Sequence, residues 1–145
     1  MNVKYYDLEN KRVFVTGGGS GIGASIVEHF CEQGSEVYFI DINEDESKKL
    51  TEDIKNKNYS LPTFIKCDLL NIKELQKTIA DIISEKGPID ILINNAANDT
   101  RHKIDDVTEE YWDERMNVNL RHFFFTVQSV KKSMIDNGGG AIINM

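Results

Sequence analysis

The stretch that decides the fold is Thr16-Gly17-Gly18-Gly19-Ser20-Gly21-Ile22-Gly23. It follows an apolar run at 12–16 and leads directly into a segment of helical period, so a strand, a glycine loop and a helix start coincide. Glycines let the backbone turn with positive φ and approach a pyrophosphate without a Cβ in the way. The helix start adds unpaired N–H groups and a partial positive charge. The stretch predicts a phosphate-binding loop, although a glycine loop alone also fits a simple tight turn.

The end of the loop narrows the classes of nucleotide-binding protein. It reads Gly23-Ala24-Ser25 and has no lysine to reach a terminal phosphate, which excludes the usual nucleoside triphosphatase loop. A methyltransferase-like site stays open, because it too can combine a glycine loop with an acidic residue after the second strand.

Around this loop, short β-branched and apolar runs alternate with longer segments of helical period. That alternation predicts an α/β fold, a doubly wound parallel sheet with helices on both faces and ligands beyond the carboxyl ends of the strands. The expected strands are Arg12–Thr16, Glu36–Asp41, Pro62–Lys66, Ile89–Asn94 and Ala141–Met145. The expected helices are Gly21–Gln33, Glu44–Asn56, Asn71–Lys86 and Thr108–Asp136.

Two acidic residues end strands on the expected ligand edge. Asp41 lies about 20 residues past the loop, the separation at which a carboxylate can accept hydrogen bonds from an adenosine ribose. It could also be only a strand-ending turn residue. The stretch 42–46 has no arginine to neutralise a 2′-phosphate and Asp41 would repel one, so NAD is expected rather than NADP. Asp68 could lie beside adenine or simply begin the turn before Asn71.

The composition limits the partners and the setting. The chain has 145 residues, 40% of them hydrophobic, which fits one domain at 1–145. Its formal charge of −7 argues against a nucleic-acid partner, which would need a basic surface. With no apolar run of about 18 residues and no signal-peptide pattern, we expect a cytoplasmic protein with no membrane partner. Cys31 and Cys67 lack metal-ligand spacing, so reduced packing thiols and no metal are expected.

These residues resemble the short-chain dehydrogenase/reductase family. The loop matches that family's TGxxxGxG pattern, and Ile89–Ala97 is similar to its NNAG strand motif, with Ala97 where glycine is usual. The resemblance covers the whole chain. It implies a Rossmann fold with five strands of a normally seven-stranded sheet, NAD as the cofactor, and a small-molecule alcohol or carbonyl substrate.

The resemblance also implies roles for single residues. Asn94 would join the central strands, and the remaining residues would touch the cofactor at the diphosphate, ribose, adenine or nicotinamide channel. The cofactor-binding residues are Gly17, Ser20, Gly21, Ile22, Gly23, Asp41, Asp68, Leu69, Asn95 and Ala96.

Asn119 lies within a predicted apolar helix stripe. The stripe has steps of three and four and comprises Trp112, Met116, Leu120, Phe123, Val127, Val130 and Met134. A buried amide needs hydrogen-bond partners. Asn119 could satisfy a core backbone group; the resemblance implies instead the asparagine of the Asn-Ser-Tyr-Lys tetrad, a catalytic residue that holds a water in the proton relay.

The family pattern is not complete in these residues. In the family, the strand similar to Ala141–Met145 leads within a few residues to a catalytic serine and then to a Tyr-x-x-x-Lys helix, and neither occurs here. None of the five tyrosines has a lysine four positions on. We therefore expect a chain truncated before the catalytic segment, with no appreciable turnover alone.

Two segments are similar to sugar or polyol dehydrogenases of the family, at 98–103 and 119–124. For His102 and His122, an exposed or packing role is favoured over a catalytic one. An NAD-dependent alcohol or sugar oxidoreductase is the first hypothesis, and a non-catalytic dinucleotide-binding or interaction module is the alternative. Because 141–145 would be an apolar edge strand, we also expect a homo-oligomer.

Overall fold

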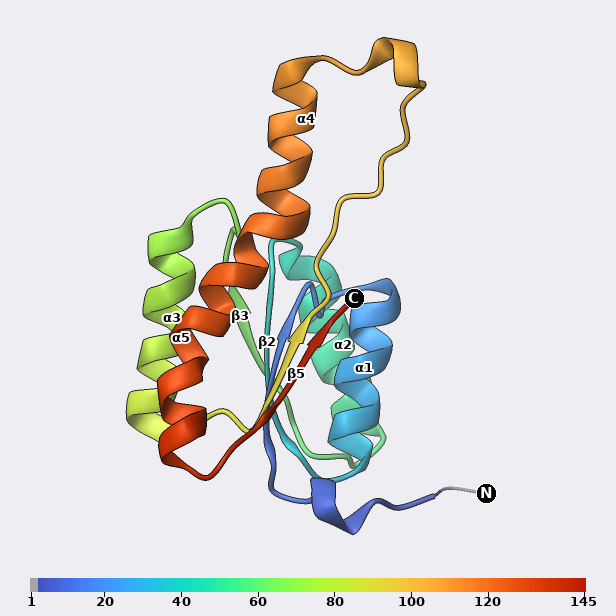
Figure 1. Cartoon of the computed structure of the whole chain (residues 1–145). Coiled ribbons are helices and arrows are strands. Elements are labelled where there is room, and N and C mark those ends of the chain that lie inside the picture. The colour runs from blue at the N-terminus through green and yellow to red at the C-terminus, as the bar shows by residue number, and fades with distance from the viewer. Residues whose placement is uncertain (1–2) are drawn as a thin grey trace.

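Five parallel strands form one sheet at the centre of the computed structural model, which describes residues 3–145 (Figure 1). The spatial order of the strands is β3-β2-β1-β4-β5. β2 and β3 are thus added on one side of β1, and β4 and β5 are added on its other side. This order confirms the predicted doubly wound fold. The bounds are β1 (Arg12–Thr16), β2 (Glu36–Asp41), β3 (Thr63–Lys66), β4 (Ile91–Asn94) and β5 (Ala141–Asn144). The last three are one or two residues shorter than predicted.

Two helices cover each face of the sheet (Figure 1). On one face lie α1 (Gly21–Glu32) and α2 (Glu44–Asn56), and on the other lie α3 (Ile72–Lys86) and α5 (His122–Asp136). The side chains of Asn43 and Asn71 cap α2 and α3 by accepting the backbone N–H of the residue three positions on. These caps satisfy a donor that the first helical turn leaves unpaired, which explains where both helices begin.

The central strands are buried on both faces, as the apolar runs predict. Val13 and Val15 pack with α1, whereas Phe14 between them points to the opposite face and joins the core under α3 and α5. Cys31 and Cys67 are free and buried, one in each core cluster. Burial raises the pKa of the Cys31 thiol to about 12 and that of Cys67 to about 11, so both behave as packing thiols. No helix within residues 3–145 is long and apolar enough to cross a membrane.

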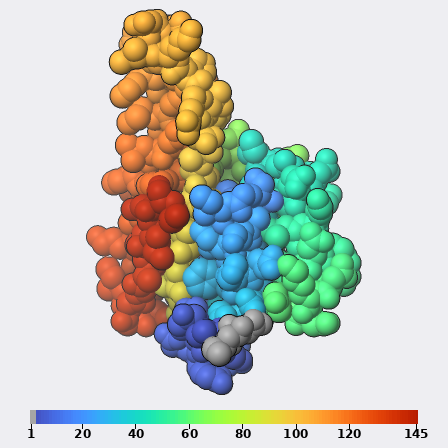
Figure 2. Space-filling model, turned by 90° about the vertical axis from the view of Figure 1, so that its right-hand side faces the viewer, coloured from blue at the N-terminus to red at the C-terminus, as the bar shows by residue number. Residues whose placement is uncertain are grey.

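The predicted helix Thr108–Asp136 is present but interrupted. It consists of α4 (Glu109–Met116), a π-helical turn η3 (Asn117–Arg121) and α5. Figures 1 and 2 show α4 and the preceding η2 (Ile104–Asp106) standing out beyond the body of the molecule as an arm. A short 3₁₀ turn, η1 (Tyr6–Leu8), precedes β1 and was not predicted.

The single apolar stripe predicted along this helix is therefore wrong in its first half. Trp112 on α4 and Leu120 on the π turn are 59% and 53% exposed, because the arm extends past the sheet. In the second half of the stripe, Val130 and Met134 are buried as predicted, and Val127 is partly buried and packs against the core.

The π turn holds one residue more than an α turn, which rotates the side chains after it by about 100° relative to those before it. His122 and Thr126 of α5 are fully buried, which the stripe did not predict, whereas Phe123 is only partly buried.

A buried polar chain crosses from α5 to the sheet edge. The hydroxyl of Thr126 donates to Asn94 Oδ1 at 2.7 Å, and Asn94 Nδ2 donates to Asn144 Oδ1 at 2.9 Å. Asn94 thus connects β4 to its neighbour β5, which is the role that the family resemblance implies for it.

The variant Thr126→Val keeps the shape of the side chain and leaves Asn94 Oδ1 without its donor. We expect the free energy of unfolding, measured by urea titration, to fall by about 1–3 kcal/mol, the cost of an unsatisfied buried acceptor. Thr51→Val is the control, since Thr51 donates only to Ser47 O within its own helix. It should change stability by no more than about 0.5 kcal/mol. Equal losses in the two variants would show that the Asn94 bond contributes nothing specific.

Candidate functional site

A cleft of about 710 Å³ opens at the carboxyl ends of the strands, at the switch point between β1 and β4 where the order of the strands reverses. All ten residues that the sequence assigned to a cofactor line this one cleft, although they come from three separate stretches of the chain and the loop before α3. The stretches are 17–23, 41–42, 67–70 and 95–99, and they are joined by Glu114 and Val118 from the arm and the π turn. The doubly wound topology brings the segments together, because every parallel strand ends at the same edge.

The glycine loop is bare backbone packed too closely for side chains. A Cβ at Gly23 would overlap the carbonyl oxygen of Gly17, and one at Gly17 would lie 2.7 Å from Ala96 Cα. Gly17 and Gly21 have φ of +66° and +55°, a conformation that favours glycine. The space beside Gly21 is open, and Ser20, the N-cap of α1, makes no capping bond with its side chain among the described residues. Amides at this helix start are thus available to an anion.

Asp41 is fixed between the loop and the second helix. Its Oδ2 accepts the N–H of Gly19 at 2.8 Å, and its Oδ1 accepts the N–H of Asn43 at 2.9 Å. A carboxylate has about four acceptor positions, so two remain for another donor. Asp41 is therefore both a strand-ending residue and an anion held at the cleft wall.

The sequence left two roles open for Asp68, a contact beside adenine and the start of the turn before Asn71, and its position fits both. Its Oδ1 accepts the N–H of Leu70 and its carbonyl accepts that of Asn71, so it builds the turn before α3. Asp68 and Leu69 nevertheless line the cleft opposite the glycine loop.

Thr16 connects the glycine loop to the end of β4. Its hydroxyl oxygen accepts the backbone N–H of Asn95 and of Ala96, and Asn95 Nδ2 donates to the carbonyls of Thr16 and Gly17. His122 Nε2 lies 3.4 Å from the same hydroxyl, and His122 Nδ1 lies 2.8 Å from the carbonyl of Val118. Because a carbonyl only accepts, Nδ1 carries the proton and Nε2 accepts from Thr16. The buried His122 is a packing residue, as favoured.

Asn119 lies in the π turn and does not line the cleft itself. Its Oδ1 accepts the N–H of Asn98 at 2.7 Å, and its Nδ2 donates to the carbonyl of Asn98 at 3.1 Å. Both ends of the amide are bonded to Asn98 and hold the loop after β4.

The tyrosines and His102 lie outside the lining of the cleft. No tyrosine of the described chain lines the cleft. His102 is exposed on the arm and stacks on Tyr111 with the ring centres 4.0 Å apart, and the Tyr111 hydroxyl donates to the carbonyl of Thr100. Within residues 3–145, no cluster of His, Cys, Asp or Glu could hold a metal ion.

Residues 11–145 match the model of the short chain dehydrogenase family. The chain belongs to this family. Its membership rules out the methyltransferase reading that the sequence left open.

Relatives of this chain include a D-xylose 1-dehydrogenase from Caulobacter vibrioides, 47% identical over 97% of this chain and 54% of that protein. An NAD-dependent glycerol dehydrogenase from Listeria innocua is 37% identical over 98% of this chain and 54% of its own length. A gluconate 5-dehydrogenase from Burkholderia cenocepacia, solved in complex with NADP and tartrate, superposes with a TM-score of 0.80 at 28% identity, covering 92% of this chain and 52% of that one. The chain thus spans about half the length of the relatives it matches.

Asn98 and Asp99 also line the cleft, at the end of β4 where the sequence places the opening of the substrate cleft. Sequence reasoning did not assign the remaining lining residues to the site: Ile40, Ile42, Cys67, Leu70, Ala97, Glu114 and Val118. The first five directly adjoin predicted site residues and could have been found. Glu114 and Val118 could not, since only the π turn and the tilt of the arm bring them to the cleft.

Because His122 is buried, its pKa is lowered, so the unfolded chain takes up a proton at a pH where the folded chain does not. The stability that this difference contributes is present above a pH of about 6.5 and is lost as the pH falls below that value. We expect the free energy of unfolding to decline between pH 7 and 5.5, by up to about 1.4 kcal/mol per pH unit.

Urea titrations of the wild type and His122→Gln across this range provide the test, with His102→Gln as the matched control on the arm. The decline should be shallower in His122→Gln and unchanged in His102→Gln. Parallel curves for all three proteins would contradict the assignment to His122.

Proposed function

We propose that this chain is the NAD-binding part of a short-chain dehydrogenase that acts on a hydroxyl or carbonyl group of a sugar or polyol. The observation that carries the proposal is Asp41, a carboxylate fixed at the end of β2 beside the glycine loop. An anion held there suits the two hydroxyls of an adenosine ribose and opposes a 2′-phosphate.

The cleft fits a dinucleotide in shape and in chemistry. The bare loop at 17–23 leaves room for a diphosphate against the start of α1, and it has the amides to bind it. Asp68 and Leu69 would contact adenine, while Asn95 and Ala96 would line the path toward the nicotinamide. Bound NAD supplies the hydride acceptor for oxidation of an alcohol.

The proposed preference for NAD rests on the charge of the cleft edge and not on similarity to the relatives. Among the relatives named above, one is NAD-dependent and another is solved with NADP, so family membership leaves the choice open. Here the acid at 41 is followed by three more acids in the first turn of α2, namely Glu44, Asp45 and Glu46. A 2′-phosphate, with a charge of about −2, would meet repulsion from this edge.

A sugar or polyol substrate is supported by the names of the relatives and by polar groups at the open end of the cleft. Asn98, Asp99 and Glu114 offer amide and carboxylate groups that can bond to several hydroxyls. Asn119 holds this wall through Asn98, and we propose that it supports the proton relay from there. The serine and the Tyr-x-x-x-Lys pair implied by the family are not among these 145 residues, so binding without turnover is expected of this chain alone.

The variant Asp41→Asn tests the cofactor proposal, because it removes the charge and keeps the shape. We expect the Kd for NADH, measured by calorimetry, to rise by roughly 10- to 100-fold, the scale of a lost charged hydrogen bond. Discrimination against NADPH should fall at the same time. Asp45→Asn removes the same charge one turn away and should change the Kd for NADH by less than about threefold. A folded wild type that takes up no NADH, or equal affinities in wild type and Asp41→Asn, would overturn the proposal.

We also propose that copies of this chain associate through β5. All four residues of the strand are exposed, and Figure 2 shows this red segment uncovered beside α1. An apolar edge strand is a template for pairing with another chain. Sedimentation should show association that grows with concentration and weakens in Ile143→Lys, whereas Ile135→Lys, at an exposed position of α5, should behave as the wild type. A stable monomer at all concentrations would contradict this.

A further inference from the structure

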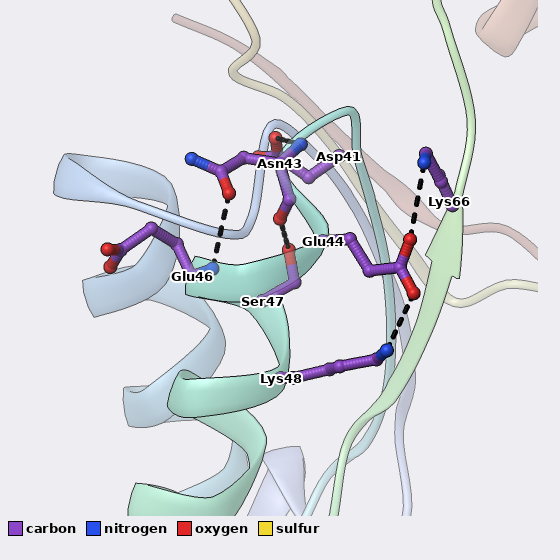
Figure 3. A network of polar contacts seen from close by, with 7 residues as sticks. All are labelled: Asp41, Asn43, Glu44, Glu46, Ser47, Lys48 and Lys66. Carbon is purple, nitrogen blue, oxygen red and sulfur yellow. Dashed lines mark hydrogen bonds and ion pairs between the residues drawn. The ribbon is translucent and has the colours of Figure 1, made fainter.

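Glu44, the first residue of α2, holds two lysines at the edge of the site (Figure 3). Its Oε1 lies 2.6 Å from Lys48 Nζ and its Oε2 lies 3.2 Å from Lys66 Nζ, so each carboxylate oxygen takes one ammonium group. These hydrogen bonds, first from Lys48 and then from Lys66, hold the pKa of Glu44 below its usual range. The carboxylate is therefore charged at neutral pH, and each of its oxygens is paired with one lysine.

Lys66 lies next to the acid proposed to bind the ribose. It is in register with Asp41 in the parallel pair β2 and β3, and neighbouring strands lie about 4.8 Å apart. Residues in register point to the same face, as shown two positions earlier by Phe39 and Phe64, whose ring centres are 5.3 Å apart. The long side chain of Lys66 thus starts one strand away from Asp41, on the same face of the sheet.

A cation beside Asp41 would favour NADP, the cofactor that the charge of Asp41 opposes. A 2′-phosphate on the ribose held by Asp41 needs positive charge nearby, and a lysine can provide it as a point charge. The start of α2 would add a further attraction for an anion, since a helix N-terminus carries partial positive charge. In this structure both sources are reduced: Asn43 caps the N–H of Glu46, and the single charge of Glu44 offsets part of the two charges of Lys48 and Lys66.

We propose that Glu44 is a specificity-determining residue that disfavours NADP by pairing with Lys66 and Lys48 and offsetting part of their positive charge beside the ribose site. This inference rests on the proposed function, because it presumes a dinucleotide whose ribose lies at Asp41. Asp41 opposes the 2′-phosphate directly, whereas Glu44 acts by occupying the cations that would otherwise offset that repulsion.

The expected effect is modest, because all three side chains are partly exposed to water. Exposed ion pairs are weak and are screened by salt. Releasing the lysines should improve the affinity for NADPH relative to NADH by roughly two- to fivefold, and the gain should vanish at about 1 M salt, where the Debye length is about 3 Å.

The test measures the Kd of NADH and of NADPH, by nicotinamide fluorescence, for the 145-residue chain and its variants at low salt. Glu44→Gln should lower the ratio of the NADPH Kd to the NADH Kd by that two- to fivefold factor. Glu46→Gln is the matched control: it removes the same charge from the same helical turn, and no ion pair of Glu46 is present within residues 3–145. Because Glu46→Gln releases no lysine, its ratio should fall by less than that of Glu44→Gln, by no more than about 1.5-fold.

Two further variants assign the effect to the lysine. In the Glu44→Gln background, Lys66→Met should abolish the gain, and Lys131→Met on α5 should preserve it. Lys66→Met alone should change the ratio by less than the roughly two- to fivefold change expected of Glu44→Gln, because the charge it removes is already partly offset by Glu44. This single variant also keeps the test decisive if thermal melting shows Glu44→Gln to be unfolded.

The outcomes separate this inference from the proposed function. Equal ratios for Glu44→Gln and Glu46→Gln, or a change in Lys66→Met alone as large as the change expected of Glu44→Gln, overturn the role of Glu44 while NADH binding through Asp41 stands. If the folded wild type binds neither dinucleotide, both proposals fail.

Discussion

The backbone of residues 17–23 can lie against the end of β4 only because it carries almost no side chains. The helix α1 approaches so closely that a methyl group on Gly23 would occupy the place of the Gly17 carbonyl oxygen. That oxygen is held from the other side by the amide of Asn95, and the hydroxyl of Thr16 accepts two further amides of the same strand end. These contacts fasten the first and fourth strands together at the switch point. They create the cleft and also the bare amides that face into it.

Charge along the cleft edge adds a choice of ligand to this shape. Asp41 is tied to the loop through Gly19, so the positions of the loop and of the acid are set together. One strand further out, Lys66 and Lys48 bring positive charge to this edge, and Glu44 offsets part of it by pairing with both (Figure 3). The preference proposed for NAD is thus a property of a small network of charges and not of one residue.

The π turn has a comparable role on the opposite side of the cleft. By holding an extra residue, it turns Asn119 toward the loop after β4 and His122 toward Thr16, so two polar side chains of one helix hold two different loops. Beyond it the arm leaves the sheet, and its apolar residues remain exposed. The same local irregularity therefore explains both the ordered cleft wall and the exposed stripe.

The sequence by itself determined the order of strands and helices, the doubly wound sheet and the ten residues gathered in the cleft. For the fold, the glycine loop and the two strand-ending acids it could do so through local rules: apolar period, glycine where φ is positive, asparagine caps and the common edge of parallel strands. Leu69, Asn95 and Ala96 followed only from the family resemblance. Only the tertiary structure decided that Asn119 bonds to Asn98, that His122 and Thr126 are fully buried and Phe123 only partly, and that Glu44 pairs with Lys66. Each of these depends on an inserted residue in a helix or on a contact between distant segments, and neither leaves a periodic signal in the order of the amino acids.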